Sequence, residues 1–311
     1  MENTMESDRP LIVPEPLRPG DRIAILSPAG IIKPEFVYKA MQVLQDAGYR
    51  PFVTPHALGR WRTYSGTPQE RFDDLRQALL DSSVKAILCS RGGYGAVHLL
   101  EDLDRLPLRE NPKWIIGYSD ISALHALMHR HGIVSIHAPM AKHLTTLKGR
   151  DDDAQALFEI LAGEPQLYSI PPSPLNRQGT AVAPLVGGNL AVIADLVATP
   201  FDTILPDTIL FIEDIAEPVY KTERILYQLR LSGALSRIKG LIVGAFTDYA
   251  PEVDGRSMEA MISSMVADYS YPVAFGVPVG HVDHNLPLQV SLPTRLEVTA
   301  DQTVIVQPAG A

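Results

Sequence analysis

The stretch KWIIGYSDISALHALMHRHG, residues 113–132, changes from a strand pattern to a helix pattern within a few residues. An apolar run over 114–116 reaches Gly117 and stops at Ser119 and Asp120. Apolar residues then recur at the three-and-four spacing of one helix face, so the stretch predicts one strand–helix unit of a parallel α/β sheet. The polar corner allows two interpretations. Either its side chains cap the helix, or a sharp turn raises the serine hydroxyl toward backbone N–H groups that would hold an oxyanion.

Strand-like and helix-like segments also alternate along the rest of the chain. The apolar run KAILCSR (85–91) predicts a strand buried on both faces, and the segment that begins with Thr67-Pro68 predicts a helix with a capping box. The segment RLEVTADQTVIVQ (295–307) predicts a terminal β-hairpin. We therefore expect an α/β fold with a parallel sheet in its N-terminal part.

The pattern of segments changes between residues 148 and 184, the expected linker region. Residues 149–165 predict a short surface helix, and the stretch that follows is rich in proline and predicts an extended linker. We expect two α/β domains, residues 1–165 and 166–311, the second ending in the hairpin. Small-molecule sites tend to lie in clefts between domains, so the active site is expected there.

Composition excludes several classes of protein. The chain has 311 residues and a net charge of −9, from 27 basic and 36 acidic residues, which argues against nucleic acid as a partner. A single cysteine excludes an intrachain disulfide. The acidic start MENTMESDRP has no apolar core of a signal peptide, and no run approaches the ~18 apolar residues of a membrane span. We expect a cytoplasmic protein without a membrane partner.

Three polar groups stand at the ends of predicted strands: Ser119, Glu213 after TILFI, and His281 in GHVDHN. Parallel sheets place ligands at the carboxyl ends of their strands. A hydroxyl, a carboxylate and an imidazole are what acyl transfer requires, because the base activates the hydroxyl and the acid orients the base. Taken singly, Glu213 would equally well be a solvated charge at a strand end or a helix cap. His281, taken singly, would be a structural loop residue.

The segment SRGGYG, residues 90–95, follows another buried strand. It lacks the Lys-Ser/Thr of a phosphate-binding P-loop and does not match G-x-G-x-x-G. Its glycines favour either a loop that supplies an N–H group to an oxyanion or a plain tight turn. Arg91 in this loop would pair with a substrate carboxylate or be solvated.

Two other constellations were weighed as sites. Cys89 falls within an apolar strand, which favours an inert buried thiol over a nucleophile. The residues His281, Asp283 and His284 offer metal-ligand chemistry, but their spacing does not present both imidazoles on one strand face. We expect no metal site.

Several ordered motifs together resemble the LD-carboxypeptidase family, serine peptidases of the S66 type. They are LRPGDRIAILSPAG (17–30), SRGGYG (90–95), IIGYSDISALHAL (115–127), IHAPM (136–140), LVGGNL (185–190), FIEDIAEPVYKTERIL (211–226) and PVGHVDHNLPL (278–288). The serine stands in G-Y-S-D, which departs from the G-x-S-x-G of α/β-hydrolases and not from the pattern of this family.

The resemblance implies a nucleophile at Ser119, an orienting acid at Glu213 and a general base at His281. It implies an oxyanion hole from the backbone N–H groups of Gly93 and Asp120. The implied reaction cleaves the L,D-peptide bond between meso-diaminopimelate and the terminal D-alanine of murein tetrapeptide. It needs no metal or organic cofactor, and the resemblance also implies a homodimer.

Two other functions stay open at this point. Within the family, microcin C immunity-type enzymes hydrolyse peptide-nucleotide amides, and Trp61 would then stack on the nucleobase. Outside it, the chain would be a non-catalytic small-molecule binder built on a two-domain cleft.

Overall fold

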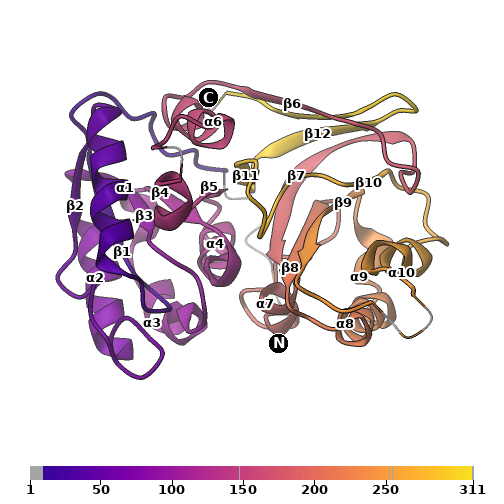
Figure 1. Ribbon diagram of the computed structural model, residues 1–311, viewed down its shortest axis with the longest axis horizontal. Helices are drawn as coiled ribbons and strands as arrows, with labels where there is room; N and C mark the ends of the chain where they lie inside the picture. Colours follow the sequence, from indigo (N-terminus) through magenta and orange to yellow (C-terminus); the bar gives the residue numbers. More distant parts are fainter. Residues whose placement is uncertain (1–9, 147, 252, 254, 310–311) are drawn as a thin grey trace.

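The computed structural model describes residues 10–146, 148–251, 253 and 255–309. Two β-sheets with their helices stand side by side, which confirms the two-domain α/β fold (Figure 1). The first sheet has the strand order β11-β5-β4-β3-β1-β2, and the second has the order β10-β9-β8-β7-β12-β13-β6. Among the helices in the described ranges, none combines the length and apolarity needed to cross a bilayer.

The first sheet is parallel from β1 to β5 and is buried on both faces. Its strands are β1 (Arg22–Leu26), β2 (Arg50–Val53), β3 (Val84–Cys89), β4 (Trp114–Gly117), β5 (Ser135–His137) and β11 (Leu288–Val290). The helical segments of this half are α1 (Pro34–Asp46), α2 (Pro68–Leu80), η1 (Ala96–Leu99), α3 (Leu100–Asp104), η2 (Leu108–Glu110), η3 (Ser119–Ile121), α4 (Ser122–Arg130), α5 (Ala141–Leu144) and α6 (Asp152–Leu161).

Side chains of successive strand residues point to opposite faces of this sheet. Ile87 and Cys89 of β3 pack with α2, α3 and α4, whereas Ala86 and Leu88 pack with α1 and α6. The predicted capping box of α2 is confirmed: Thr67 accepts a hydrogen bond from the Glu70 N–H, and the Glu70 carboxylate accepts one from the Thr67 N–H.

The second sheet combines a parallel and an antiparallel part. Its strands are β6 (Gln166–Ile170), β7 (Gly179–Asn189), β8 (Ile209–Ile215), β9 (Gly240–Thr247), β10 (Val273–Phe275), β12 (Pro293–Val298) and β13 (Thr303–Gln307). The helices α7 (Leu190–Asp195), α8 (Val219–Leu231), α9 (Ala234–Arg237) and α10 (Met258–Met265) cover one face of its parallel part. Antiparallel pairing of β12 with β13 confirms the terminal hairpin.

Two segments differ from what the sequence indicates. In residues 148–184 the expected short helix is confirmed as α6, but it packs against a core, and the stretch expected as an extended linker contains β6 and the start of β7. Tyr168 and Ile170 of β6 are buried while Leu167 and Ser169 are exposed, so this strand packs one face on a core. The short strand β11 was not predicted, and it returns from the C-terminal half to pair antiparallel with β5 (Figure 1).

The LVGGNL motif joins the two domains beside the polar corner. The N–H of Asn189, at the end of β7, donates a hydrogen bond of 2.9 Å to the Ser122 hydroxyl at the start of α4. Gly188 has φ +140°, and a Cβ there would lie 2.3 Å from that hydroxyl oxygen. Only glycine lets the second sheet approach the helix after Ser119 so closely.

Candidate active site

Ser119 occupies a strained turn between β4 and α4. Its φ is +65°, a left-handed conformation that is uncommon for residues other than glycine. Neither η3 nor α4 has a side-chain cap hydrogen bond at its N-terminus, so the capping interpretation of this corner does not hold. Strain of this kind costs on the order of 1–3 kcal/mol and is found preferentially at functional sites.

Glu213 and His281 form a hydrogen bond. Glu213 lies in β8 and is fully buried, and its Oε2 lies 2.8 Å from Nδ1 of His281. Gly280, with φ +118°, allows this approach, because a Cβ there would lie 2.7 Å from the same carboxylate oxygen. Burial raises the pKa of Glu213, and the contact with His281 opposes that rise. An imidazolium that forms at His281 would therefore find a desolvated carboxylate beside it.

Ser119 and His281 line one cleft of about 1600 Å³, together with Tyr118 and the glycine loop. The Tyr118 ring lies edge-on to the His281 ring at 5.0 Å between centroids. Burial raises the pKa of Tyr118 to about 12, so its hydroxyl stays protonated near neutral pH and does not act as a base. Within the described ranges, no hydrogen bond joins the Ser119 hydroxyl to the His281 ring.

The loop of residues 90–95 lies against the serine. A Cβ at Gly92 would lie 2.9 Å from the Ser119 hydroxyl oxygen and 3.2 Å from the Asp120 nitrogen. The Gly92 carbonyl accepts a 2.9 Å hydrogen bond from the Gly30 N–H. Because carbonyl and N–H of a trans peptide point in opposite directions, the N–H of Gly93 points away from Gly30.

Two buried charged side chains hold this loop in place. The Asp120 carboxylate accepts a hydrogen bond of 2.9 Å from the Ala96 N–H. Burial raises the pKa of Asp120, and its backbone hydrogen bonds and Arg71 oppose that rise. Arg71, from α2 and 1% exposed, donates to the carbonyls of Gly95, Pro28 and Gly66. Nothing in the local sequence indicates this role of Arg71, because the residue lies on a helix with an amphipathic, polar pattern.

Basic side chains predominate in the cleft although the chain as a whole is acidic. Its charged lining residues are Lys33, Arg60, Arg62, Arg91, Lys142 and Asp283. The field of such a lining attracts anions. Arg91 also donates a hydrogen bond to the Ile31 carbonyl, so it lies at the cleft wall and is partly fixed.

The thiol of Cys89 is inert. It is fully buried in β3, and burial raises its pKa, so the thiolate form is disfavoured.

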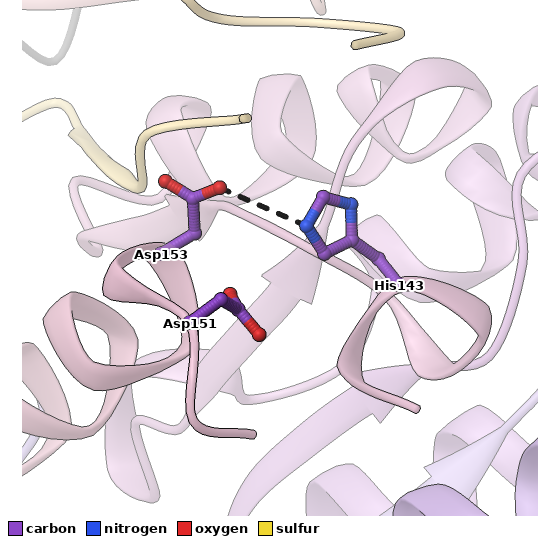
Figure 2. Close-up of side chains that lie close together, drawn as sticks. All are labelled: His143, Asp151 and Asp153. Atoms are coloured by element: carbon purple, nitrogen blue, oxygen red, sulfur yellow. Dashed lines mark ion pairs between the residues drawn. The ribbon is translucent and has the colours of Figure 1, made fainter. Parts of the chain in front are cut away.

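The histidines of the HVDH segment bind different carboxylates. His281 contacts Glu213, whereas His284 contacts Asp153. Another group of metal-ligand type, which the sequence analysis missed, consists of His143, Asp151 and Asp153 (Figure 2). Its carboxylates already have roles within the protein: Asp151 caps α6, and Asp153 accepts a hydrogen bond from the chain after His284.

Trp61 packs on its own neighbours. Its ring stacks on Tyr64 with 5.7 Å between centroids, and the Arg62 guanidinium lies 4.5 Å from its centroid. Arg60, Arg62 and Thr63 line the cleft, and Trp61 is not among its lining residues.

Comparisons with known proteins agree on one family. The model of the LD-carboxypeptidase N-terminal domain matches residues 23–138, and that of the C-terminal domain matches residues 182–296. A putative carboxypeptidase of Synechocystis sp. is 34% identical, covering 91% of this chain and 94% of its own. A murein tetrapeptide carboxypeptidase of Pseudomonas aeruginosa is 31% identical, with 85% and 89% covered.

Solved structures with the same fold include two kinds of protein. The crystal structure of muramoyltetrapeptide carboxypeptidase from Oxalobacter formigenes has a TM-score of 0.84 at 29% identity, covering 92% of this chain and 98% of that one. The structure of MccF in complex with glutamyl sulfamoyl guanosine has a TM-score of 0.86 at 20% identity, with 97% and 100% covered. The second likeness concerns the fold alone.

Proposed function

The chain belongs to the LD-carboxypeptidase family, and we propose that it is a serine carboxypeptidase acting on murein tetrapeptide. It would cleave the L,D-peptide bond between meso-diaminopimelate and the terminal D-alanine. The observation that carries this proposal is the Glu213–His281 pair, whose histidine lines the same cleft as the strained Ser119. Relatives with names of this activity align along most of the chain.

In the proposed mechanism His281 is the general base. Its Nδ1–H donates to Glu213, which leaves Nε2 free to take the proton of the Ser119 hydroxyl. The serine oxygen then bonds to the substrate carbonyl carbon. The imidazolium gives its proton to the leaving amine as the C–N bond breaks, and D-alanine departs. Water, deprotonated by the same imidazole, attacks the acyl-enzyme, and the serine recovers its proton.

The oxyanion is assigned to the backbone N–H groups of Asp120 and Gly93. The position of Gly92 against both Ser119 and the Asp120 nitrogen supports this assignment, as does the direction of the Gly93 N–H. Loss of one such donor typically costs about 2.7–4 kcal/mol of transition-state stabilisation.

The basic lining of the cleft supports an anionic peptide as the substrate. The tetrapeptide carries several carboxylates, including the one on its terminal D-alanine. Arg91, which belongs to the loop that contacts Ser119 and lines the cleft, is suited to bind a carboxylate. No step of the mechanism requires a metal or an organic cofactor.

We also propose that the enzyme is a cytoplasmic homodimer that serves peptidoglycan recycling. The outer face of β6, β13, β12 and β7 supports self-association. Leu167 and Val182, 68% and 67% exposed, lie in one cross-strand row with Val306 and Arg295. Sedimentation velocity of the purified protein tests the homodimer, and a monomer at all concentrations would contradict it.

One experiment separates the proposed carboxypeptidase from an immunity-type hydrolase and from a non-catalytic binder. Purified protein is incubated with murein tetrapeptide, with the tripeptide lacking D-alanine, and with an aminoacyl-nucleotide amide. We expect D-alanine from the tetrapeptide alone, and Ser119→Ala should release none while keeping its fold. Cleavage of the nucleotide amide only would favour the immunity-type function. Binding without turnover, and no labelling of Ser119 by a fluorophosphonate, would favour a non-catalytic binder.

A further inference from the structure

The segment that carries His281 has no regular secondary structure. Residues 276–287 lie between β10 and β11 without a helix or strand of their own. Near its start the Val279 carbonyl accepts a 2.8 Å hydrogen bond from the Ala245 N–H of β9. A catalytic base on such a segment needs further contacts to stay in place, because a shift of about 1 Å can cost roughly 10²-fold in rate.

Asp153, which lies in the first turn of α6 (Figure 2), supplies contacts of this kind. It is 1% exposed, and its Oδ2 accepts a 2.7 Å hydrogen bond from the backbone N–H of Asn285. Its Oδ1 lies 2.7 Å from Nδ1 of His284, an electrostatic contact without hydrogen-bond geometry. Nε2 of His143 lies 3.7 Å from Oδ2. One buried carboxylate thus contacts two imidazoles and a backbone N–H.

The hydrogen bonds continue from Asp153 to the residue before His281. Asn285 is fully buried, and its side-chain Oδ1 accepts a 2.9 Å hydrogen bond from the Gly280 N–H. Asp153 therefore holds Asn285, and Asn285 holds the backbone N–H of Gly280, the residue before His281.

The helix that carries Asp153 is packed firmly against the first domain. Leu157, Ile160 and Leu161 of α6 lie in the same core as α1 and one face of the first sheet. Ser119 follows a strand of that sheet, whereas Glu213 belongs to the second sheet. Asp153 therefore ties the segment of the base to the domain that carries the serine.

We propose that Asp153 is a positioning residue of the reaction, which fixes His281 relative to Ser119 by holding residues 280–285. This inference rests on the proposed function. Asp153 does not touch the reacting atoms and acts through Asn285.

The same side chains could instead hold a metal ion, so the experiment includes that outcome. Activity of the purified enzyme is measured before and after dialysis against EDTA, and again after zinc is added. Unchanged activity supports the positioning role. Loss with EDTA and recovery with zinc would overturn it.

The variants separate the contacts of Asp153. Asp153→Ala removes every contact, whereas Asp153→Asn keeps an oxygen that can accept from the Asn285 N–H. The exposed neighbour on the same helix turn provides the matched control, Asp152→Asn. His284→Gln removes only the imidazole, whose side chain is 55% exposed, and leaves the buried bonds in place.

Rates are taken on murein tetrapeptide and divided by the concentration of sites that a fluorophosphonate labels. We expect Asp153→Ala to lower kcat by about 10²-fold with KM unchanged, as for a misplaced catalytic group. Asp153→Asn should recover only part of that loss and keep kcat about 10-fold below the wild type, because a neutral amide oxygen accepts from the Asn285 N–H more weakly than a carboxylate does. Asp152→Asn should match the wild type.

A spectroscopic measurement tests the same point without turnover. The Nδ1 proton between His281 and Glu213 should give a downfield proton resonance, assigned by its loss in His281→Gln. We expect it to persist in Asp152→Asn and His284→Gln, and to broaden or disappear in Asp153→Ala.

The outcomes distinguish the two proposals. Wild-type kcat per labelled site and an unchanged resonance in Asp153→Ala would refute the role of Asp153, while an inactive Ser119→Ala would leave the proposed function intact. If Ser119→Ala releases D-alanine as the wild type does, the proposed function fails. Should Asp153→Ala not fold, the comparison of Asp153→Asn with Asp152→Asn decides: identical kcat and an identical resonance refute the inference.

Discussion

Substitution of Gly92 by alanine would place a methyl group directly against the serine hydroxyl. The new Cβ would lie 2.8 Å from Ser119 Cβ, 2.9 Å from its Oγ and 3.2 Å from the Asp120 nitrogen. Gly92 is not among the glycines with positive φ, so alanine fits the local backbone and the effect comes from the contact alone.

The size of the effect follows from these distances. The contact with Ser119 Cβ is roughly 0.7 Å shorter than the ~3.5 Å at which carbon atoms normally touch. Ser119 is already held at φ +65°, so either the serine or the glycine loop must move. A displaced nucleophile or a lost oxyanion donor each costs about 10²-fold or more. We expect kcat/KM to fall by about 10²–10³-fold, and the free energy of unfolding to fall by about 1–3 kcal/mol from overpacking.

The assay is D-alanine release from murein tetrapeptide, together with urea unfolding of the same preparation. Gly240→Ala provides the matched control. It lies in β9 with no positive φ, and its nearest contact would be 3.2 Å from the end of the Leu296 side chain. We expect this control to keep its activity.

Full activity of Gly92→Ala would refute the reasoning, because the loop could then not lie against Ser119 during the reaction. If Gly240→Ala lost activity to the same extent as Gly92→Ala, the reasoning would also be contradicted, since general destabilisation would then explain both losses.

Three further predictions concern the charge of Glu213, the support of the glycine loop by Arg71 and the pH dependence of stability. Glu213→Gln should lower kcat by roughly 10³–10⁴-fold with KM and thermal stability unchanged, because the amide NH2 group can face Nδ1 of His281 and hold the ring in the wrong tautomer. Steady-state kinetics measure this, and an active variant would contradict it. Arg71→Met should lower the free energy of unfolding by about 3–5 kcal/mol and reduce kcat, since three backbone carbonyls lose their hydrogen-bond donor. Unfolding in urea measures the first effect and the peptide assay the second. An unaltered kcat would show that the glycine loop keeps its conformation without Arg71. Burial lowers the pKa of His125 and His129 to about 4. Between pH 6.5 and pH 4 only the unfolded chain therefore binds protons at these two histidines. Their contribution to the free energy of unfolding should be retained above pH 6.5 and fall by roughly 3 kcal/mol per histidine as pH drops from 6.5 to 4. Urea unfolding of the wild type and of His129→Gln at several pH values tests this. Equal losses of stability between pH 7 and pH 4 in the two proteins would refute it.

Much of the fold could be predicted because its signals are local. The capping box at Thr67, the strand that ends at Cys89 and the terminal hairpin depend on residues close in sequence. The corner at Ser119 was also visible, but its role was not. A capping side chain needs an extended backbone, whereas Ser119 has φ +65°, and the letters G-Y-S-D do not specify that angle.

The features that were missed depend on contacts between distant parts of the chain. Asp153 contacts residues 284 and 285, which are far away in sequence, so nothing near Asp153 indicates its partners. The strand β11 has three residues between Pro287 and Pro293 and is too short for a periodic pattern. The prolines of the expected linker fall after β6. The alternation of buried Tyr168 and Ile170 with exposed residues, which marks β6 as a strand, covers only five residues and stands directly before these prolines.

The return of β11 to the first sheet affects how this protein can be recombined with its relatives. Residues Leu288–Val290 complete an edge that the first half builds, and Leu288 stands opposite His137 of β5. A chimera joined near residue 165 would therefore set β5 from one parent against β11 from the other. Crossovers that also exchange the segment around β11 keep this pairing within one parent, and they are the natural choice for swapping specificity between relatives.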